Sequence, residues 1–182
     1  GYLQRFVQSF NGIVIDKNTT KWQFDMGGSN FPYYDAGSVS DGLLKAGAIA
    51  LICAMKYPPA IIMVEEIENG INQRNLSEFF SWLKSTSGMN ETQFILTSHS
   101  PSVIREFNKE LDKVYKVDLK EKSGYKSMVT NLNEALSPLV NLGTVAEDAI
   151  IGFKELDDGK KSVQIRAYEL TELFYNGVLG NL

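Results

Sequence analysis

Two adjacent carboxylates, Glu65 and Glu66, directly follow an apolar run at residues 60–64. This run lies between Pro58–Pro59 and Asn69–Gly70, and its short apolar pattern predicts a strand buried on both faces. Open α/β sheets bind ligands at the carboxyl ends of their strands, which is where the two acids emerge. One carboxylate could hold a magnesium-bound water while the other acts as a general base. The pattern therefore indicates metal-assisted hydrolysis of a phosphate compound.

Two other segments carry residues suited to the same chemistry. Ser40, Asp41 and Gly42 open a long apolar segment, and the start of a buried helix attracts anions through its unpaired amides and its dipole. Ser40 can also act as a plain N-cap, and both roles use the same helix end. Lys45, one turn further on, could reach either a phosphate or a surface carboxylate. His99, the single histidine, follows the next predicted strand, where it could hold a γ-phosphate or orient a water.

Hydrophobic spacing predicts the elements that position these residues. Residues 41–57 predict a helix that is buried nearly all round, with Ser40 as its N-cap. Residues 76–83 predict an amphipathic helix and 92–97 a strand, so strand, helix and strand imply a right-handed parallel crossover. The remaining expectations are a short helix at 2–10, a hairpin of strands 12–16 and 21–26, a loop at 27–37, a helix at 101–107, a strand at 113–119 with a partner near 125–130, a turn at Asp158–Gly159 and a helix at 165–175.

Composition predicts one domain of 182 residues located in the cytoplasm. The net charge of −4 gives no general attraction to nucleic acid or anionic lipid. The single cysteine, Cys53, rules out an internal disulfide and lies in an apolar run, where we expect a packed thiol. The longest apolar stretch, residues 47–55, is too short to span a membrane. Trp22 and Trp82 are expected in the core, whereas Tyr33 and Tyr34 could stack on a base.

The three segments together resemble the carboxyl-terminal lobe of ABC-type ATPase heads, especially the AAA-like group related to SMC, RecF and overcoming-lysogenization-defect proteins. Val-Ser-Asp-Gly-Leu at 39–43 is similar to the signature motif, residues 61–68 to the Walker B strand and its acids, and Ser-His-Ser-Pro at 98–101 to the switch histidine. The likeness extends over roughly residues 36–182, including the ending at 173–180. It implies an α/β fold, a partial P-loop NTPase with a mainly parallel central sheet flanked by helices and a small antiparallel element.

The resemblance also implies a role for each matching residue, with ATP and Mg²⁺ as cofactors. Glu65 would hold Mg²⁺ through water, Glu66 would be the catalytic base and His99 would contact the γ-phosphate. The residues that would contact nucleotide or border its site are Ser40, Asp41, Gly42, Lys45, Asn69 and Gly70, the last two in the D-loop. In this family ATP lies between two heads, so a second head, as in a homodimer, would supply Ser40 and Gly42 to the partner's nucleotide.

The sequence departs from the family at two places. Ile67 stands where relatives have proline, and Asn72–Gln73 stand where many have His-Pro, which puts the D-loop geometry in question. The motif Gly-x-x-x-x-Gly-Lys-Ser/Thr is also missing, and the only Gly-Lys pair, Gly159–Lys160, has the wrong spacing for it. We therefore expect a Walker A lobe on a separate chain or in a segment outside this sequence, without which the strand ending at residue 97 has an open apolar edge.

Three functions remain open at this point. The first is an ATPase head that drives a conformational change in a DNA-processing or defence assembly, with DNA or an effector protein as partner and no membrane; alone, the chain would be inactive. The second is a non-catalytic binding or scaffold module that lacks a phosphate loop. The third is a metal-dependent nuclease that uses Glu65, Glu66 and Glu68.

Overall fold

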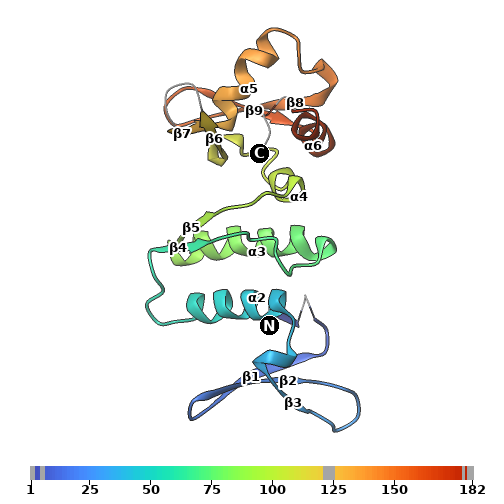
Figure 1. Cartoon of the computed structure of the whole chain (residues 1–182). Helices are drawn as coiled ribbons and strands as arrows, with labels where there is room; N and C mark the ends of the chain where they lie inside the picture. The colour runs from blue at the N-terminus through green and yellow to red at the C-terminus, as the bar shows by residue number, and fades with distance from the viewer. Residues whose placement is uncertain (1–2, 5–6, 121–125, 178, 180–182) are drawn as a thin grey trace. The chain divides into compact units, whose positions relative to one another are not determined.

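The chain forms two compact units, Gly1–Ser98 and His99–Leu182. The computed structural model describes residues 3–4, 7–120, 126–177 and 179, with residues 119 and 120 described by their backbone alone. The first unit runs from blue to green in Figure 1, and the second runs from yellow-green to dark red. The single domain expected over residues 1–182 stays a prediction.

An antiparallel sheet opens the first unit. Its strands β1 (Phe10–Asp16), β2 (Thr19–Phe24) and β3 (Tyr33–Asp35) pair in the order β1-β2-β3. The hairpin predicted from strands 12–16 and 21–26 is confirmed, and Lys17 in its turn has a left-handed φ of 52°. β3 lies inside segment 27–37, which the sequence predicts to be a loop.

The helix predicted over residues 2–10 is wrong in its later part. Residues 3 and 4 are helical, but residues 7–9 are not, and residues 2, 5 and 6 lie outside the described residues. Phe10 instead starts β1, where it pairs with Phe24 and packs beside Trp22 with ring centroids 5.9 Å apart. The aromatic contacts of the sheet therefore outweigh the helical spacing of this segment.

Helix α2 (Asp41–Cys53) follows a short 3-10 turn, Ala36–Ser38. Ser40 is its N-cap as predicted, because its Oγ accepts a hydrogen bond from the Leu43 amide at 3.4 Å. The helix ends at Cys53, four residues before the predicted end at residue 57. Leu51 is exposed, so the prediction of a helix buried nearly all round is wrong for that side.

A parallel strand pair completes the first unit. β4 (Ile61–Val64) and β5 (Gln93–Leu96) pair in register from Ile61–Gln93 to Val64–Leu96, joined by helix α3 (Gln73–Asn90). The predicted strand, helix and strand are confirmed. Trp22 and Trp82 are buried, as expected.

One face of this strand pair is uncovered in the described part of the unit. Ile62 is buried on one face, but on the other Ile61 is 52% and Met63 74% exposed, beside the exposed Ile95 of β5. The prediction that β4 is buried on both faces is therefore wrong for the residues described. Side chains alternate along a strand, and the described segments of this unit place a layer over only one side of it.

In its described residues, the second unit contains three helices and two antiparallel hairpins. Its helices are α4 (Pro101–Arg105), α5 (Leu132–Asn141) and α6 (Ala167–Tyr175), with 3-10 turns at Leu111–Lys113 and Glu147–Ala149. Its strands are β6 (Tyr115–Lys120), β7 (Lys126–Asn131), β8 (Ile150–Glu155) and β9 (Lys161–Ile165), paired β6-β7 and β8-β9. Leu111, Leu136, Ile165 and Leu170 are fully buried in its core.

Most predictions for the second unit are confirmed. The partner strand expected near 125–130 is observed from residue 126 onward, with residue 125 outside the described residues. Gly159 forms the expected turn with a left-handed φ of 79°, and the terminal helix starts two residues later than predicted. Helix α5, which is capped by the Asn131 side chain and contains Pro138, is not among the predicted elements.

The α/β class is confirmed, with β4 and β5 as a small parallel sheet. The other strand pairs in the described residues are antiparallel. Among the helices described, none combines the length and the apolar character needed to cross a membrane.

Candidate functional site

Glu65 and Glu66 lie at the carboxyl end of β4, as the sequence predicts, and both are exposed. The neighbouring β5 continues beside them, because the Thr97 amide donates to the Val64 carbonyl at 3.0 Å. The two acids and Thr97 therefore meet where both parallel strands end.

Glu66 has a left-handed backbone, with φ of 45°. Its amide donates to Thr97 Oγ1 at 3.1 Å, and its carbonyl accepts from Lys45 Nζ at 2.7 Å and from the Asn69 amide at 2.9 Å. The Asn69 side-chain amide also donates to Glu66 Oε2. Non-glycine residues adopt this conformation only where their surroundings hold them in it, and such residues cluster at functional sites.

Lys45 and Thr97 contribute contacts that sequence reasoning missed. The sequence suggested a phosphate or a carboxylate as the partner of Lys45, but in the structure its ammonium contacts a backbone carbonyl. Thr97 could have been found from the predicted parallel pairing, since it follows Leu96, the partner of Val64. No residue pattern identifies a backbone acceptor such as the Glu66 carbonyl.

Ile67 fixes the turn that follows the acids. Its side chain is 0% exposed, and its amide donates to the Thr97 carbonyl at 3.1 Å. A proline at this position could not make that hydrogen bond. The turn continues with the Ile71 amide donating to the Glu68 carbonyl at 3.0 Å, and Gly70 has a left-handed φ of 78°.

The first turn of α2 packs directly against this segment. A Cβ at Gly42 would overlap the Gly70 carbonyl, and a Cβ at Gly70 would lie 2.5 Å from the Gly42 amide nitrogen. Only two glycines allow the two backbones to approach so closely. The structure thus brings Ser40, Asp41 and Gly42 beside Asn69 and Gly70.

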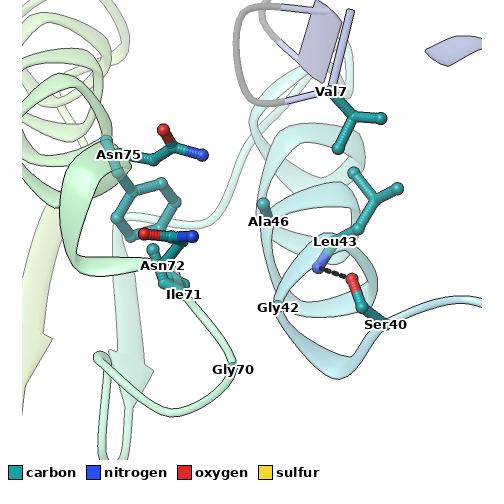
Figure 2. A pocket seen from close by; sticks show the side chains of 10 residues that line it. Val7, Ser40, Gly42, Leu43, Ala46, Gly70, Ile71, Asn72 and Asn75 are labelled. Atoms are coloured by element: carbon teal, nitrogen blue, oxygen red, sulfur yellow. Dashed lines mark hydrogen bonds between the residues drawn. The ribbon is translucent and has the colours of Figure 1, made fainter. Parts of the chain in front are cut away.

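A pocket of about 240 Å³ lies between α2 and the Gly70 segment. Figure 2 shows the Gly70 loop facing the start of α2, with the Ser40 hydroxyl bonded to the Leu43 amide. The residues that line it come from α2, the Gly70 segment and the start of α3, and include Ser40, Leu43, Ala46, Ile71, Asn72 and Asn75. Its lining is partly apolar and partly polar, without an ionisable group among the lining residues.

The acid pair fits the coordination habits of Mg²⁺. This ion is usually bound through one or two carboxylates, with waters and substrate phosphates completing its shell. Glu65 and Glu66 supply two exposed carboxylates at one strand end. Over the described ranges, no three His, Cys, Asp or Glu side chains are grouped so that they could hold a metal ion.

His99 is the first residue of the second unit, and its side chain is exposed. Ser100 and Pro101 follow it at the start of α4. The structure brings the other candidate residues together within the first unit, and the role of His99 beside them stays a prediction.

Comparison with known proteins identifies the family. Residues 3–105, more than half of the chain, match the family described as AAA domain, putative AbiEii toxin, type IV TA system. The chain belongs to this AAA-domain family. All the candidate site residues of this AAA domain, from Ser40 to His99, lie within the matched range. No curated protein matches the chain.

Solved structures of SMC heads share the fold of this AAA domain. One, from a study of ATP-driven dimerization and DNA-stimulated activation of SMC ATPases, is 15% identical and covers 78% of this chain and 86% of its own, with a TM-score of 0.51. A Smc head bound to the C-winged helix domain of ScpA is 15% identical, with a TM-score of 0.53 and coverage of 74% and 41%. A Smc head with an extended coiled coil, bound to the C-terminal domain of ScpA and derived from Pyrococcus furiosus, is 16% identical, with a TM-score of 0.52 and coverage of 78% and 35%.

The chain is therefore an AAA domain that shares its fold with SMC heads. It spans 41% and 35% of the second and third of these structures, so a large part of those chains has no counterpart here. ATPases of this family bind nucleotide, typically with Mg²⁺.

Proposed function

We propose that this AAA domain supplies the signature motif, the Walker B acids and the switch histidine to an ATP-hydrolysing head. ATP is bound between two such heads, and its hydrolysis drives a conformational change in a DNA-processing or defence assembly. The observation that carries the proposal is the Glu65–Glu66 pair at the end of β4, with Glu66 held at a φ of 45°. Glu66 opens the turn in which its carbonyl accepts from the Asn69 amide at 2.9 Å, and an acid used as a base must be oriented.

The proposed mechanism assigns one task to each carboxylate. Glu66 accepts the proton of the water that attacks the γ-phosphorus of ATP, and the products are ADP and phosphate. Glu65 would hold Mg²⁺ through a water, and the ion would supply positive charge against the phosphates. Asn69, which donates to Glu66 Oε2, leaves the other carboxylate oxygen available to the water. His99 contacts the γ-phosphate.

The start of α2 is proposed to contact the ATP of the opposite head. Ser40 and Gly42 present the first amides of a 13-residue helix, and such amides bind phosphate oxygens. The close packing of Gly42 on Gly70 puts this helix end beside the segment proposed to be the D-loop. One head therefore contributes to two nucleotides, its own through the acids and its partner's through α2, which requires pairing of heads before hydrolysis.

We further propose that a lobe carrying the Walker A motif covers the open face of the parallel strand pair. Ile61, Met63 and Ile95 form an apolar surface on that face, and β5 carries no charged residue along its length. Folded proteins cover or pair such strands, because an exposed apolar edge invites aggregation. Smc head chains that extend well beyond the matched region are consistent with a further lobe.

Glu66→Gln in the complete head tests the proposal. Glutamine keeps an oxygen to accept from Asn69 but cannot take a proton, so we expect ATP turnover to fall by about 10²–10⁴-fold while ATP binding is kept. Glu91→Gln is a matched control, because Glu91 is exposed and has a similar left-handed φ of 54° at the end of α3, away from the site. Equal turnover in the two variants would contradict the assignment of Glu66 as base.

A non-catalytic scaffold is the second candidate, favoured by the missing Gly-x-x-x-x-Gly-Lys-Ser/Thr motif. It keeps the fold but predicts that heads do not pair on ATP, even when a Walker A lobe is present. Sedimentation of the complete head with and without ATP separates the two functions.

The kinds of partner that we propose are a second head and a protein that docks on the head, as ScpA domains do on the Smc heads. The single cysteine agrees with a cytoplasmic location.

A further inference from the structure

Glu66 differs from the other non-glycine residues that have a left-handed backbone. Among the described residues these are Lys17, with φ of 52°, and Glu91, with φ of 54°. Lys17 lies in the tight β1-β2 turn and Glu91 is the C-cap of α3, which are common places for such a conformation. Glu66 comes two residues after the end of a strand and opens a turn closed by the Asn69 amide, at the site proposed for catalysis.

Two residues from other elements hold the backbone of Glu66 on both sides. The Thr97 hydroxyl, at the end of β5, accepts from the Glu66 amide at 3.1 Å. The Lys45 ammonium, one turn into α2, donates to the Glu66 carbonyl at 2.7 Å. The amide and the carbonyl that define the Glu66 conformation are thus each bound by a side chain that is distant in sequence.

We propose that Lys45 and Thr97 are positioning residues that hold Glu66 in its left-handed conformation and so set the place of its carboxylate. The inference rests on the proposed function and deepens it. In this role the Lys45 ammonium binds the backbone carbonyl of the base, Glu66, and does not bind a phosphate. Because Lys45 belongs to the helix that begins with Ser40 and Gly42, the same contact ties the position of the base to the helix end that meets the partner's ATP.

Lys45→Met and Thr97→Val remove the two contacts with little change in size. Methionine keeps the aliphatic stem of Lys45 and loses the donor. Valine removes only the Thr97 hydroxyl, because the Thr97 amide and carbonyl still bond to Val64 and Ile67. Lys45→Arg and Thr97→Ser keep a donor and an acceptor, and Lys109→Met is a control at an exposed lysine outside the site.

The kinetic test measures kcat and KM for ATP in the complete head. We expect Lys45→Met and Thr97→Val each to lower kcat by about 10–100-fold with KM changed by less than about twofold, because a small misplacement of a catalytic group costs rate and not binding. The conservative variants should recover part of kcat, and ATP-dependent pairing should be kept. A higher KM or weaker pairing with normal kcat in Lys45→Met would overturn the positioning role, since Lys45 would then contact nucleotide.

A second measurement does not depend on hydrolysis. Hydrogen exchange of the Glu66 amide, measured by NMR on the chain without nucleotide, should be faster in Thr97→Val than in the parent chain. The Ile67 amide keeps its acceptor, the carbonyl of residue 97, so its exchange rate should be the same in both proteins. Unchanged exchange at Glu66 would overturn the inference. Normal turnover in Glu66→Gln would defeat the proposed function itself, whereas normal turnover in both positioning variants beside an inactive Glu66→Gln would defeat only this inference.

Discussion

Gly42→Ala should strongly destabilise the first unit, because the backbones of α2 and the Gly70 segment are in contact. The new Cβ would overlap the Gly70 carbonyl and lie 3.1 Å from the Ile71 amide nitrogen. Both neighbours are backbone atoms, which cannot rotate away as a side chain can, so α2 and the segment must move apart. Overpacking of this kind costs about 1–3 kcal/mol, and contact with rigid backbone favours the upper end of that range.

Gly88→Ala provides a matched control within the same unit. Gly88 is also in a helix, α3, but a Cβ there meets nothing within 4 Å. Alanine should therefore stabilise this helix by about 0.5–1 kcal/mol, since glycine loses more conformational freedom on folding. The two variants make the same chemical change in opposite environments.

Thermal unfolding followed by circular dichroism compares the two variants with the parent chain. For a protein of this size 1 kcal/mol shifts Tm by roughly 2–4 °C, so a cost of about 3 kcal/mol predicts a loss of about 6–12 °C for Gly42→Ala. Gly88→Ala should gain roughly 1–4 °C on the same scale. A Tm for Gly42→Ala that rises as it does for Gly88→Ala would refute the close packing of α2 on the Gly70 segment.

Two further predictions concern Ile67 and Cys53. Ile67→Ala should cost about 2–5 kcal/mol in urea unfolding, because the fully buried side chain leaves a cavity; a cost below about 0.5 kcal/mol would show that the turn is not anchored there. Burial raises the pKa of the Cys53 thiol above its ordinary 9.0, because the folded chain favours the neutral thiol over the thiolate. The stability of the folded chain therefore falls as pH rises above the thiol pKa of the unfolded chain. Alkylation by iodoacetamide near pH 9 should then be slower in the folded than in the urea-unfolded chain, and equal rates would contradict the burial of Cys53.

The elements around the site could be predicted because each carries a local signal. Ser40 before an apolar segment predicts an N-cap, and the spacing of residues 76–83 predicts a helix. The apolar runs on either side of that helix predict the parallel pair β4 and β5. Each signal depends only on residues that are close together in the sequence. The place of the two acids at the end of β4 could therefore be predicted as well.

The contacts that hold the acids could not be predicted in the same way. The Lys45 ammonium finds a backbone carbonyl, which every residue carries, and Thr97 is one of many hydroxyl residues at strand ends. The short β3 is paired with β2, a contact that its own three residues do not predict. Helix α5 contains Pro138, and proline is disfavoured inside a helix. The exposure of Ile61 and Met63 depends on what packs over β4, which no pattern within the strand reveals.

Turnover and pairing measured on one Glu66→Gln protein test the central claim most directly. The protein is the complete head, assayed for ATP hydrolysis and, by sedimentation, for ATP-dependent dimers. If Glu66 is the base, hydrolysis is lost and the dimers persist, because glutamine keeps the contact with Asn69 but cannot accept a proton. Hydrolysis at the rate of the Glu91→Gln control would contradict the account.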